Sequence, residues 1–321
     1  MTSFPELQEK FESYLKAYRF PDSPKKLYDS CTHILSIGGK RVRPVLSLMA
    51  HEIFKPLNKN AEYAALAIEI FHNFTLVHDD IMDRAKLRRG KMTVHEKYDV
   101  PTAILAGDVL SIHAYECLNK MEHPKKDETI ALFNQTAIEI CEGQQMDMDF
   151  EERDDVSLED YVQMIGLKTS VLLACGLKMG AFLADASDED ATHLYEFGKN
   201  VGIAFQLQDD YLDAFGDEAK TGKKSGGDIL MNKKTVLHCQ TLTMASAEQA
   251  GKYHRLCAEA GEAKIQGIKD LMQETGATTF TKERIEHFTQ EGFRHLEKVS
   301  ASAEQKEPLR SLAMYLLKRE A

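Results

Sequence analysis

The sequence predicts an all-α protein, a large helical bundle, and three observations favour this class. Apolar residues recur at i, i+3, i+4 and i+7 through five long segments. Alternation with a period of two residues is nearly absent, and Gly and Pro fall between the periodic segments. Because no linker rich in Pro, Gly or Ser divides the 321 residues, we expect one domain spanning residues 1–321.

The expected helices are apolar over much of their surface, which indicates burial in a bundle. Two of them begin with a capping pattern, Ser157 with Asp160 and Ser187 with Asp190. The five ranges are 61–82, 102–121, 128–150, 158–184 and 189–215.

Composition excludes several classes of protein. A hydrophobic fraction of 43% excludes a disordered or collagen-like chain. The net charge of -11 argues against a nucleic-acid binder. Residues 1–16 lack the apolar core of a signal peptide, and the longest apolar stretch, 171–184, is too short for stable membrane insertion. Six cysteines without a Cys-x-x-Cys pair predict reduced thiols in a cytoplasmic protein.

Two segments, 79–83 and 209–213, repeat the pattern Asp-Asp-x-x-Asp at the C-terminal end of an apolar helix. Asp79 shares a helix face with Asp83, and Asp209 shares one with Asp213. Like charges at that spacing, at the negative end of the helix dipole, are unfavourable unless a cation binds. Either cluster alone is also compatible with a solvated acidic helix end. Two clusters that face one cavity predict Mg²⁺ sites for a diphosphate, because Mg²⁺ takes carboxylate and phosphate oxygens.

Cations flank both acidic clusters, which predicts local phosphate sites in an acidic protein. A glycine turn with three cations, Gly-Gly-Lys-Arg-Val-Arg-Pro, opens a helix at residues 38–44. Five cations follow the first acidic cluster within residues 84–91, and four more follow the second within residues 223–234.

Taken together, these motifs resemble the trans-isoprenyl diphosphate synthases, or polyprenyl synthetases. The resemblance rests on both aspartate clusters, on residues 38–44, on Arg88-Arg89-Gly90 and on residues 205–210, and it covers roughly residues 30–319. It implies the isoprenoid synthase type of bundle, with a deep central cavity, in a homodimer. The implied reaction joins isopentenyl diphosphate head-to-tail to an allylic diphosphate. One departure is Met92, where the family usually has Pro, and it concerns the conformation of that loop.

The resemblance also implies roles for single residues. About three Mg²⁺ ions on the allylic diphosphate would be held by Asp79, Asp83 and Asp209, with support from Asp80, Asp210 and Asp213. The implied cationic contacts of that diphosphate are Lys168, Lys223 and Arg88, with Lys233 nearby. The implied ligands of isopentenyl diphosphate are Lys40, Arg43, His72 and Arg89. The residues implied to face the carbocation are Thr169 and Gln206. Further matches of the family pattern are Gln144, Asp147, Lys318 and Arg319.

Product length is expected to depend on residues before the first aspartate cluster. In the family, bulky residues four and five positions before its first Asp shorten the product, and here these are Thr75 and Phe74. One aromatic at the fifth position resembles C20 synthases, so geranylgeranyl diphosphate is favoured over C15 farnesyl diphosphate. Helix geometry places Phe71 and Thr75 on the face of Asp79 and leaves Phe74 off it, so Phe71 is a second candidate for the cavity floor.

Three other functions stay open: a longer-chain polyprenyl synthase, a class I terpene cyclase and a non-catalytic synthase subunit. A cyclase usually has a different second metal motif, and a non-catalytic subunit is expected to have lost metal aspartates. Both aspartate clusters are complete here, which favours the condensing enzyme.

Overall fold

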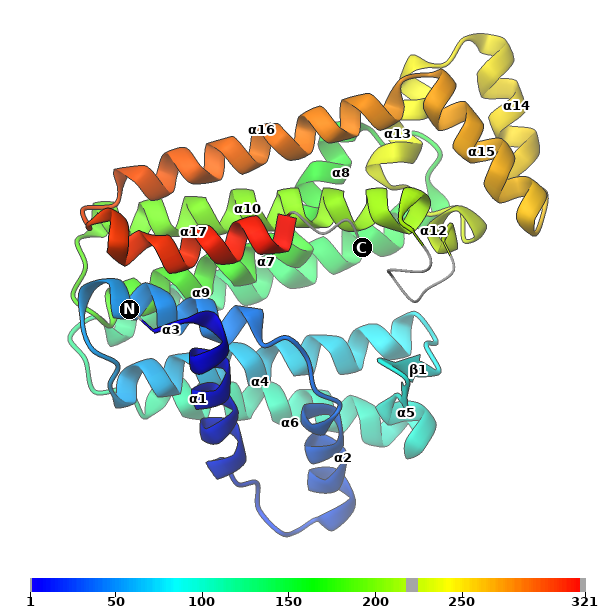
Figure 1. Ribbon diagram of the computed structural model, residues 1–321. Coiled ribbons are helices and arrows are strands. Elements are labelled where there is room, and N and C mark those ends of the chain that lie inside the picture. The colour runs from blue at the N-terminus through cyan, green and yellow to red at the C-terminus, as the bar shows by residue number, and fades with distance from the viewer. Residues whose placement is uncertain (1, 218–224, 318–321) are drawn as a thin grey trace. The chain divides into compact units, whose positions relative to one another are not determined.

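The computed structural model describes residues 2–217 and 225–317 (Figure 1). Within these ranges the chain is predominantly helical, and the strands are the two-residue β1 (Leu87–Arg88) and β2 (Lys91–Met92). The predicted all-α class is therefore confirmed. Lys223, Lys318 and Arg319 lie outside the described residues.

The described chain divides into two compact units, and each unit consists of three segments of the sequence. The first unit contains the described residues up to Leu132, then Gly176–Thr192 and Ser300–Leu309. The second contains Phe133–Cys175, His193–Val299 and the described residues from Arg310 onward. The expectation of one domain over residues 1–321 stays a prediction.

In the first unit, α4 is the central helix and packs along α6 (Figure 1). It begins two residues earlier than expected and is capped there, because the Asn58 side chain accepts hydrogen bonds from the backbone N–H groups of Asn60 and Ala61. Its apolar residues from Ala61 to Phe71 are almost completely buried. The helices of this unit are α1 (Phe4–Ala17), α2 (Lys25–Ser36), α3 (Val42–Phe54), α4 (Lys59–Met82), α5 (Val94–Lys97) and α6 (Val100–Asn119).

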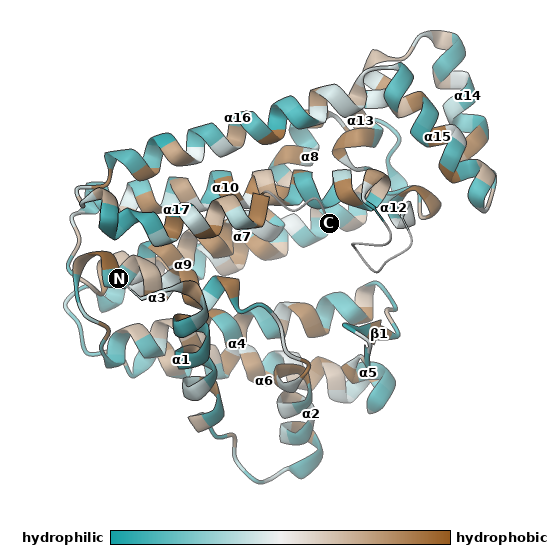
Figure 2. Cartoon of the chain, in the orientation of Figure 1, coloured by the Kyte–Doolittle hydropathy of each residue, from teal (hydrophilic) through white to brown (hydrophobic). Residues whose placement is uncertain are grey.

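Four helices contain residues of both units, namely α7 (Lys126–Glu152), α9 (Val171–Phe182), α10 (Asp188–Phe215) and α17 (Ala303–Leu317). The remaining helices belong to the second unit, and they are α8 (Leu158–Ile165), η1 (Gly166–Ser170), α12 (Gly227–Leu230), α13 (Val236–Met244), α14 (Ala247–Cys257), α15 (Glu262–Glu274) and α16 (Ala277–Lys298). Apolar residues of α8, α10, α13 and α15 form the core of the second unit. Figure 2 shows α9 as almost wholly hydrophobic, whereas polar and apolar residues alternate along α16.

The predicted helix over 158–184 begins as expected, with Ser157 accepting from the Asp160 backbone, but the π-helix η1 interrupts it. Two glycines explain how η1 is enclosed. A Cβ on Gly143 of α7 would lie 2.4 Å from the Lys168 backbone nitrogen, and one on Gly202 of α10 would lie 2.8 Å from Cα of Ser170. Because these neighbours are backbone atoms, only glycine allows α7 and α10 to approach η1 so closely.

The stretch Leu158–Phe182 is long and apolar enough to cross a membrane by length and composition. However, 78% of its most apolar window is buried inside the protein, which is typical of a core helix. None of the six cysteines forms a disulfide in the described residues, and Cys31, Cys117, Cys175 and Cys239 are buried.

Candidate active site

The first aspartate cluster forms the last turn of α4 and is tied to the hairpin that follows it. Asp80 is 1% exposed, and its carboxylate accepts hydrogen bonds of 2.9 and 3.0 Å from Nε of Arg88. Arg88 also contacts Asp79, with 3.3 Å between Nη2 and Oδ2. Burial raises the pKa of Asp80, and the Arg88 charge opposes that shift. Arg88, expected to contact a diphosphate, is therefore oriented by two members of the acidic cluster.

A two-residue turn positions the next arginine. Arg89 (φ +50°) and Gly90 (φ +75°) both adopt left-handed backbone conformations between the paired strands β1 and β2, as tight hairpin turns require. Met92 pairs with Leu87 in this hairpin, and its carbonyl lies 2.8 Å from Nε2 of His33. Met92, which stands where the resembled family usually has Pro, therefore takes part in regular hairpin pairing.

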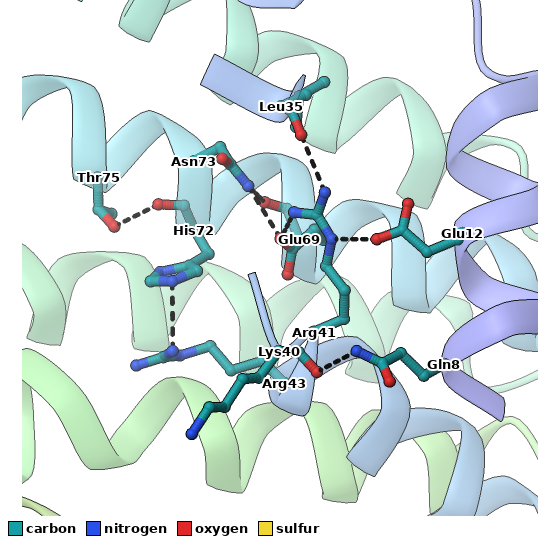
Figure 3. A network of polar contacts seen from close by, with 10 residues as sticks. All are labelled: Gln8, Glu12, Leu35, Lys40, Arg41, Arg43, Glu69, His72, Asn73 and Thr75. Atoms are coloured by element: carbon teal, nitrogen blue, oxygen red, sulfur yellow. Dashed lines mark hydrogen bonds and ion pairs between the residues drawn. The ribbon is translucent and has the colours of Figure 1, made fainter. Parts of the chain in front are cut away.

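The glycine turn before α3 lies directly beside Arg89. A Cβ on Gly39 would be 2.5 Å from Nη1 of Arg89, so the absence of a side chain there makes room for the guanidinium. The adjacent Lys40 is exposed, and its carbonyl accepts a hydrogen bond of 3.2 Å from Gln8 (Figure 3). The turn therefore brings Lys40 and Arg89 close to one another from segments about 50 residues apart.

Arg43 and His72 meet between the first turn of α3 and the middle of α4, with 3.3 Å between Nη1 and Nε2 (Figure 3). Burial lowers the pKa of His72 well below its usual value, and the charges of Arg43 and Arg89 lower it further. The imidazole is therefore neutral at pH 7 and can accept from a guanidinium. Burial also lowers the pKa of Arg43, with an added contribution from Arg89. The predicted isopentenyl diphosphate ligands Arg43, His72 and Arg89 thus form one cluster beside Lys40.

The second aspartate cluster forms the end of α10 and is tied to other elements of the second unit. Asp210 accepts hydrogen bonds from the Tyr161 hydroxyl and, at 3.1 Å, from the amide of Gln206. Burial raises the pKa of Asp210 to about 7. Asp213 accepts from the backbone N–H of Asp228 at 2.9 Å. Asp228 has its own pKa raised by burial and by Asp213.

Lys168 projects from the π-helix η1, and its ammonium lies 2.5 Å from Oδ2 of Asp147 on α7. Thr169 is the next residue of η1 and is half-buried. Lys233 lies 3.7 Å from Asp228, which gives it a place beside the second cluster. Lys168 and Lys233, each expected near the allylic diphosphate, are therefore both paired with an aspartate of the second unit.

The aromatic residues before the first cluster form a column along α4. Phe71 is 3% exposed and contacts Phe74 edge-to-face at 5.1 Å between ring centroids. Phe74 in turn contacts His78 at 5.0 Å, and His78 lies 3.1 Å from the carbonyl of Ile104 in α6. Thr75 is half-buried and bonds to the His72 carbonyl.

No three His, Cys, Asp or Glu residues of the described chain are arranged to hold a metal ion by themselves. The donor set nevertheless fits Mg²⁺, which is usually bound by one or two carboxylates and completed by water and substrate phosphates. Asp79 and Asp83 stand four residues apart at the end of α4, and Asp209 and Asp213 do so at the end of α10.

Sequence reasoning did not single out Arg41, Tyr161 or Asp228 as site residues. Arg41 lies in the cationic turn but is buried, at 5% exposure. Tyr161 is separated from Asp210 by 49 residues, and no local pattern signals their contact. Asp228 follows a glycine pair, which is the one local signal that its backbone approaches another group.

Comparisons with known proteins agree with the motifs. The family model "Polyprenyl synthetase" matches residues 24–275. A geranylgeranyl pyrophosphate synthase of Geoglobus acetivorans is 37% identical over 98% of this chain and 96% of its own. A geranylfarnesyl diphosphate synthase of Natronomonas pharaonis is 35% identical over 92% of this chain and 91% of its own. A crystal structure of a geranylgeranyl pyrophosphate synthase has a TM-score of 0.93 and 42% identity, with all of both chains covered.

Proposed function

Because the chain belongs to the polyprenyl synthetase family, we propose that this prenyltransferase joins isopentenyl diphosphate head-to-tail to an allylic diphosphate. One observation carries the proposal: Arg43, His72 and Arg89 gather around the Gly39-Lys40 turn, beside a helix that ends in an aspartate cluster. This provides a cationic site for one diphosphate next to carboxylates suited to a second. The test is release of diphosphate, which should require Mg²⁺, an allylic diphosphate and isopentenyl diphosphate together.

The same assay separates the alternatives. A terpene cyclase would release diphosphate from the allylic substrate alone, and a non-catalytic subunit would release none. The cationic cluster favours the condensing enzyme, since a cyclase has no second diphosphate to bind.

In this proposal, the nucleophilic substrate is held by its diphosphate. Arg43 and Arg89 provide planar forks for phosphate oxygens, Lys40 provides a mobile charge, and neutral His72 orients Arg43. Arg43 is half-buried, so its charge is less screened by water than that of the exposed Arg89 and Lys40, and we expect it to contribute most to binding the anion.

The allylic diphosphate is proposed to lie at the two aspartate clusters. About three Mg²⁺ ions would be held by Asp79, Asp83 and Asp209, with support from Asp80, Asp210 and Asp213. Bound there, Mg²⁺ would neutralise the diphosphate as a leaving group. Among the cations, Arg88 is oriented by Asp80, and Lys168 is oriented by Asp147. Lys233 adds positive charge beside the second cluster, where Lys223 is also proposed to act.

Thr169 and Gln206 are proposed to direct their oxygen dipoles towards the allylic cation. The Gln206 side chain supports this role, since its amide nitrogen donates to Asp210 and the carbonyl oxygen is thereby directed elsewhere. Replacing Gln206 by Leu should lower kcat and leave the KM values within about threefold.

We propose geranylgeranyl diphosphate as the main product. The single aromatic at Phe74 with the small Thr75 supports C20, and the names of the Geoglobus relative and the matched crystal structure agree with it. The nearest longer alternative product is C25 geranylfarnesyl diphosphate, because the Natronomonas relative is named for it. The shorter alternative product is farnesyl diphosphate. Chromatography of products from dimethylallyl, geranyl and farnesyl diphosphate decides both the product and the preferred primer.

We propose a cytoplasmic homodimer. Free cysteines support a reducing compartment. Helix α6 exposes four large apolar residues, which a second copy of the chain would cover. They are Val100, Ile104, Leu105 and Ile112. Sedimentation should give twice the chain mass of 36.2 kDa, and Leu105→Asp should shift it towards that of one chain.

A further inference from the structure

Arg41 differs from the other cations of its turn because it faces the protein interior. Its side chain is 3% exposed, and the guanidinium donates three hydrogen bonds (Figure 3). Nε donates to Glu12 at 2.8 Å, Nη1 to Glu69 at 2.6 Å and Nη2 to the Leu35 carbonyl at 2.9 Å. All three guanidinium nitrogens are thus engaged by the protein, which leaves little capacity to bind a substrate.

The three acceptors come from three different helices. Glu12 belongs to α1, Leu35 to the last turn of α2, and Glu69 to α4. The Leu35 carbonyl is one of those that a helix end leaves without a helical partner. Arg41 itself precedes the first residue of α3 and has a left-handed backbone with φ +50°. One side chain therefore fixes where α3 begins with respect to α1, α2 and α4.

Glu69 is held as firmly as Arg41. It is 4% exposed, and its carboxylate Oε1 also accepts from Nδ2 of Asn73 at 3.1 Å. His72 follows Glu69 by three residues on α4 and contacts Arg43 (Figure 3). Two adjacent turns of α4 thus contact two arginines of the cationic segment, so the Arg41–Glu69 pair sets the register in which Lys40 and Arg43 are presented.

Stability alone is a poor reason for this arrangement. A buried ion pair gains little over well-packed apolar residues, because removing two charges from water offsets their attraction. The Arg41 guanidinium is bound to two carboxylates, one buried and one 34% exposed. Because the guanidinium is planar, these bonds fix the orientation of the side chain as well as its distance from the carboxylates.

We propose that Arg41, clamped by Glu69, is a positioning residue that presents Lys40 and Arg43 to isopentenyl diphosphate and does not itself bind that substrate. This inference rests on the proposed function. It contradicts the simple interpretation of the turn as three equivalent phosphate ligands.

A double-mutant cycle tests the clamp. Arg41→Gln and Glu69→Gln should each raise the KM for isopentenyl diphosphate at least tenfold, because a 1 Å misplacement of binding groups costs up to about a hundredfold. The KM for the allylic diphosphate and kcat should stay within about twofold. The double variant should be no worse than the poorer single variant, because both remove the same contact. Calorimetric titration of each variant with isopentenyl diphosphate should show the same losses without turnover.

The opposite model predicts a different result for Glu69→Gln. If Arg41 binds the diphosphate, releasing its guanidinium should leave that KM unchanged or lower it, and multiplicative losses in the double variant would point the same way. Either outcome overturns the clamp. If Arg41→Gln does not fold, Arg41→Lys keeps the charge and loses the fork, and it should still raise the KM at least threefold.

Two controls separate positioning from general damage. Lys264→Met removes another buried cation, whose hydrogen bonds within the described residues go to the carbonyls of Leu230 and Cys257 in the second unit. It should lower the melting temperature without changing the KM for isopentenyl diphosphate. An equal KM increase in this control would refute the specific role of Arg41. Wild-type enzyme that consumes no isopentenyl diphosphate would refute the proposed function, whereas active wild type with unchanged variants refutes the clamp alone.

Discussion

Replacing Gly39 by Ala should damage substrate binding while sparing the fold. The added Cβ would lie 2.5 Å from Nη1 and 3.0 Å from Cζ of Arg89. Non-bonded carbon and nitrogen atoms need about 3.5 Å, so the guanidinium must move by about 1 Å. The atoms that move are the end of a flexible side chain, and Gly39 does not have a left-handed backbone, so the protein can accommodate the methyl group.

The expected magnitude follows from what Arg89 is proposed to do. Losing or misaligning one charge-assisted hydrogen bond costs about 1.5–3 kcal/mol, which corresponds to about a tenfold to hundredfold rise in the KM for isopentenyl diphosphate. The melting temperature should be unchanged or slightly raised, because alanine restricts the unfolded chain.

Initial rates at varied isopentenyl diphosphate, paired with thermal melts, measure both quantities. Gly38→Ala is the matched control: its backbone has φ +87°, so alanine is strained there, but no atom lies within 4 Å of the new Cβ. It should lower the melting temperature and change the KM far less than Gly39→Ala does. A folded Gly39→Ala enzyme with wild-type KM would refute the reasoning that this glycine exists to admit Arg89.

Three further outcomes are expected. Asp79→Ala and Asp209→Ala should each lower kcat at least about 100-fold, the usual scale for a lost electrostatic stabiliser, and the rate at saturating Mg²⁺ measures this. Phe74→Ala should lengthen the product on chromatography, because it removes the middle ring of the column that Phe71 begins; an unchanged product from both Phe74→Ala and Phe71→Ala would exclude them as the floor. Burial lowers the pKa of His238 to about 4, so the unfolded state binds an extra proton between about pH 6.5 and 4. Stability should therefore fall by about 3 kcal/mol as pH falls through that window, and denaturant titrations should show a shallower loss for His238→Gln.

The long helices could be predicted because the apolar residues that stabilise them recur at helical spacing along the sequence. In α4, apolar residues on every side of the helix indicate burial, and Asn58 supplies the cap that fixes its start. The π-helix η1 could not be predicted in this way, since it depends on Gly143 and Gly202 bringing two other backbones against Lys168 and Ser170. Such close approaches involve residues distant in sequence and leave no local pattern.

The candidate site shows the same division. The aspartate clusters could be recognised in the sequence because paired carboxylates at the negative end of a helix repel one another unless a cation binds. The contact of Tyr161 with Asp210 was not visible, because a tyrosine four residues after a capped helix start has the pattern of an ordinary core residue. Its hydroxyl matters only through a partner from another helix.

Charge counting also misjudges how many cations are available to an anionic substrate. Within the described residues, Arg41 is neutralised by Glu12 and Glu69, whereas Arg88 uses Nε and Nη2 on Asp79 and Asp80. The first arrangement occupies every guanidinium nitrogen and is fit only for positioning. The contacts of Arg88 with Asp79 and Asp80 leave its Nη1 edge for a ligand. The acidic cluster that is proposed to bind Mg²⁺ therefore also orients a cation. An excess of acidic residues is therefore compatible with binding two diphosphates, because some of the carboxylates serve to place the few cations that bind.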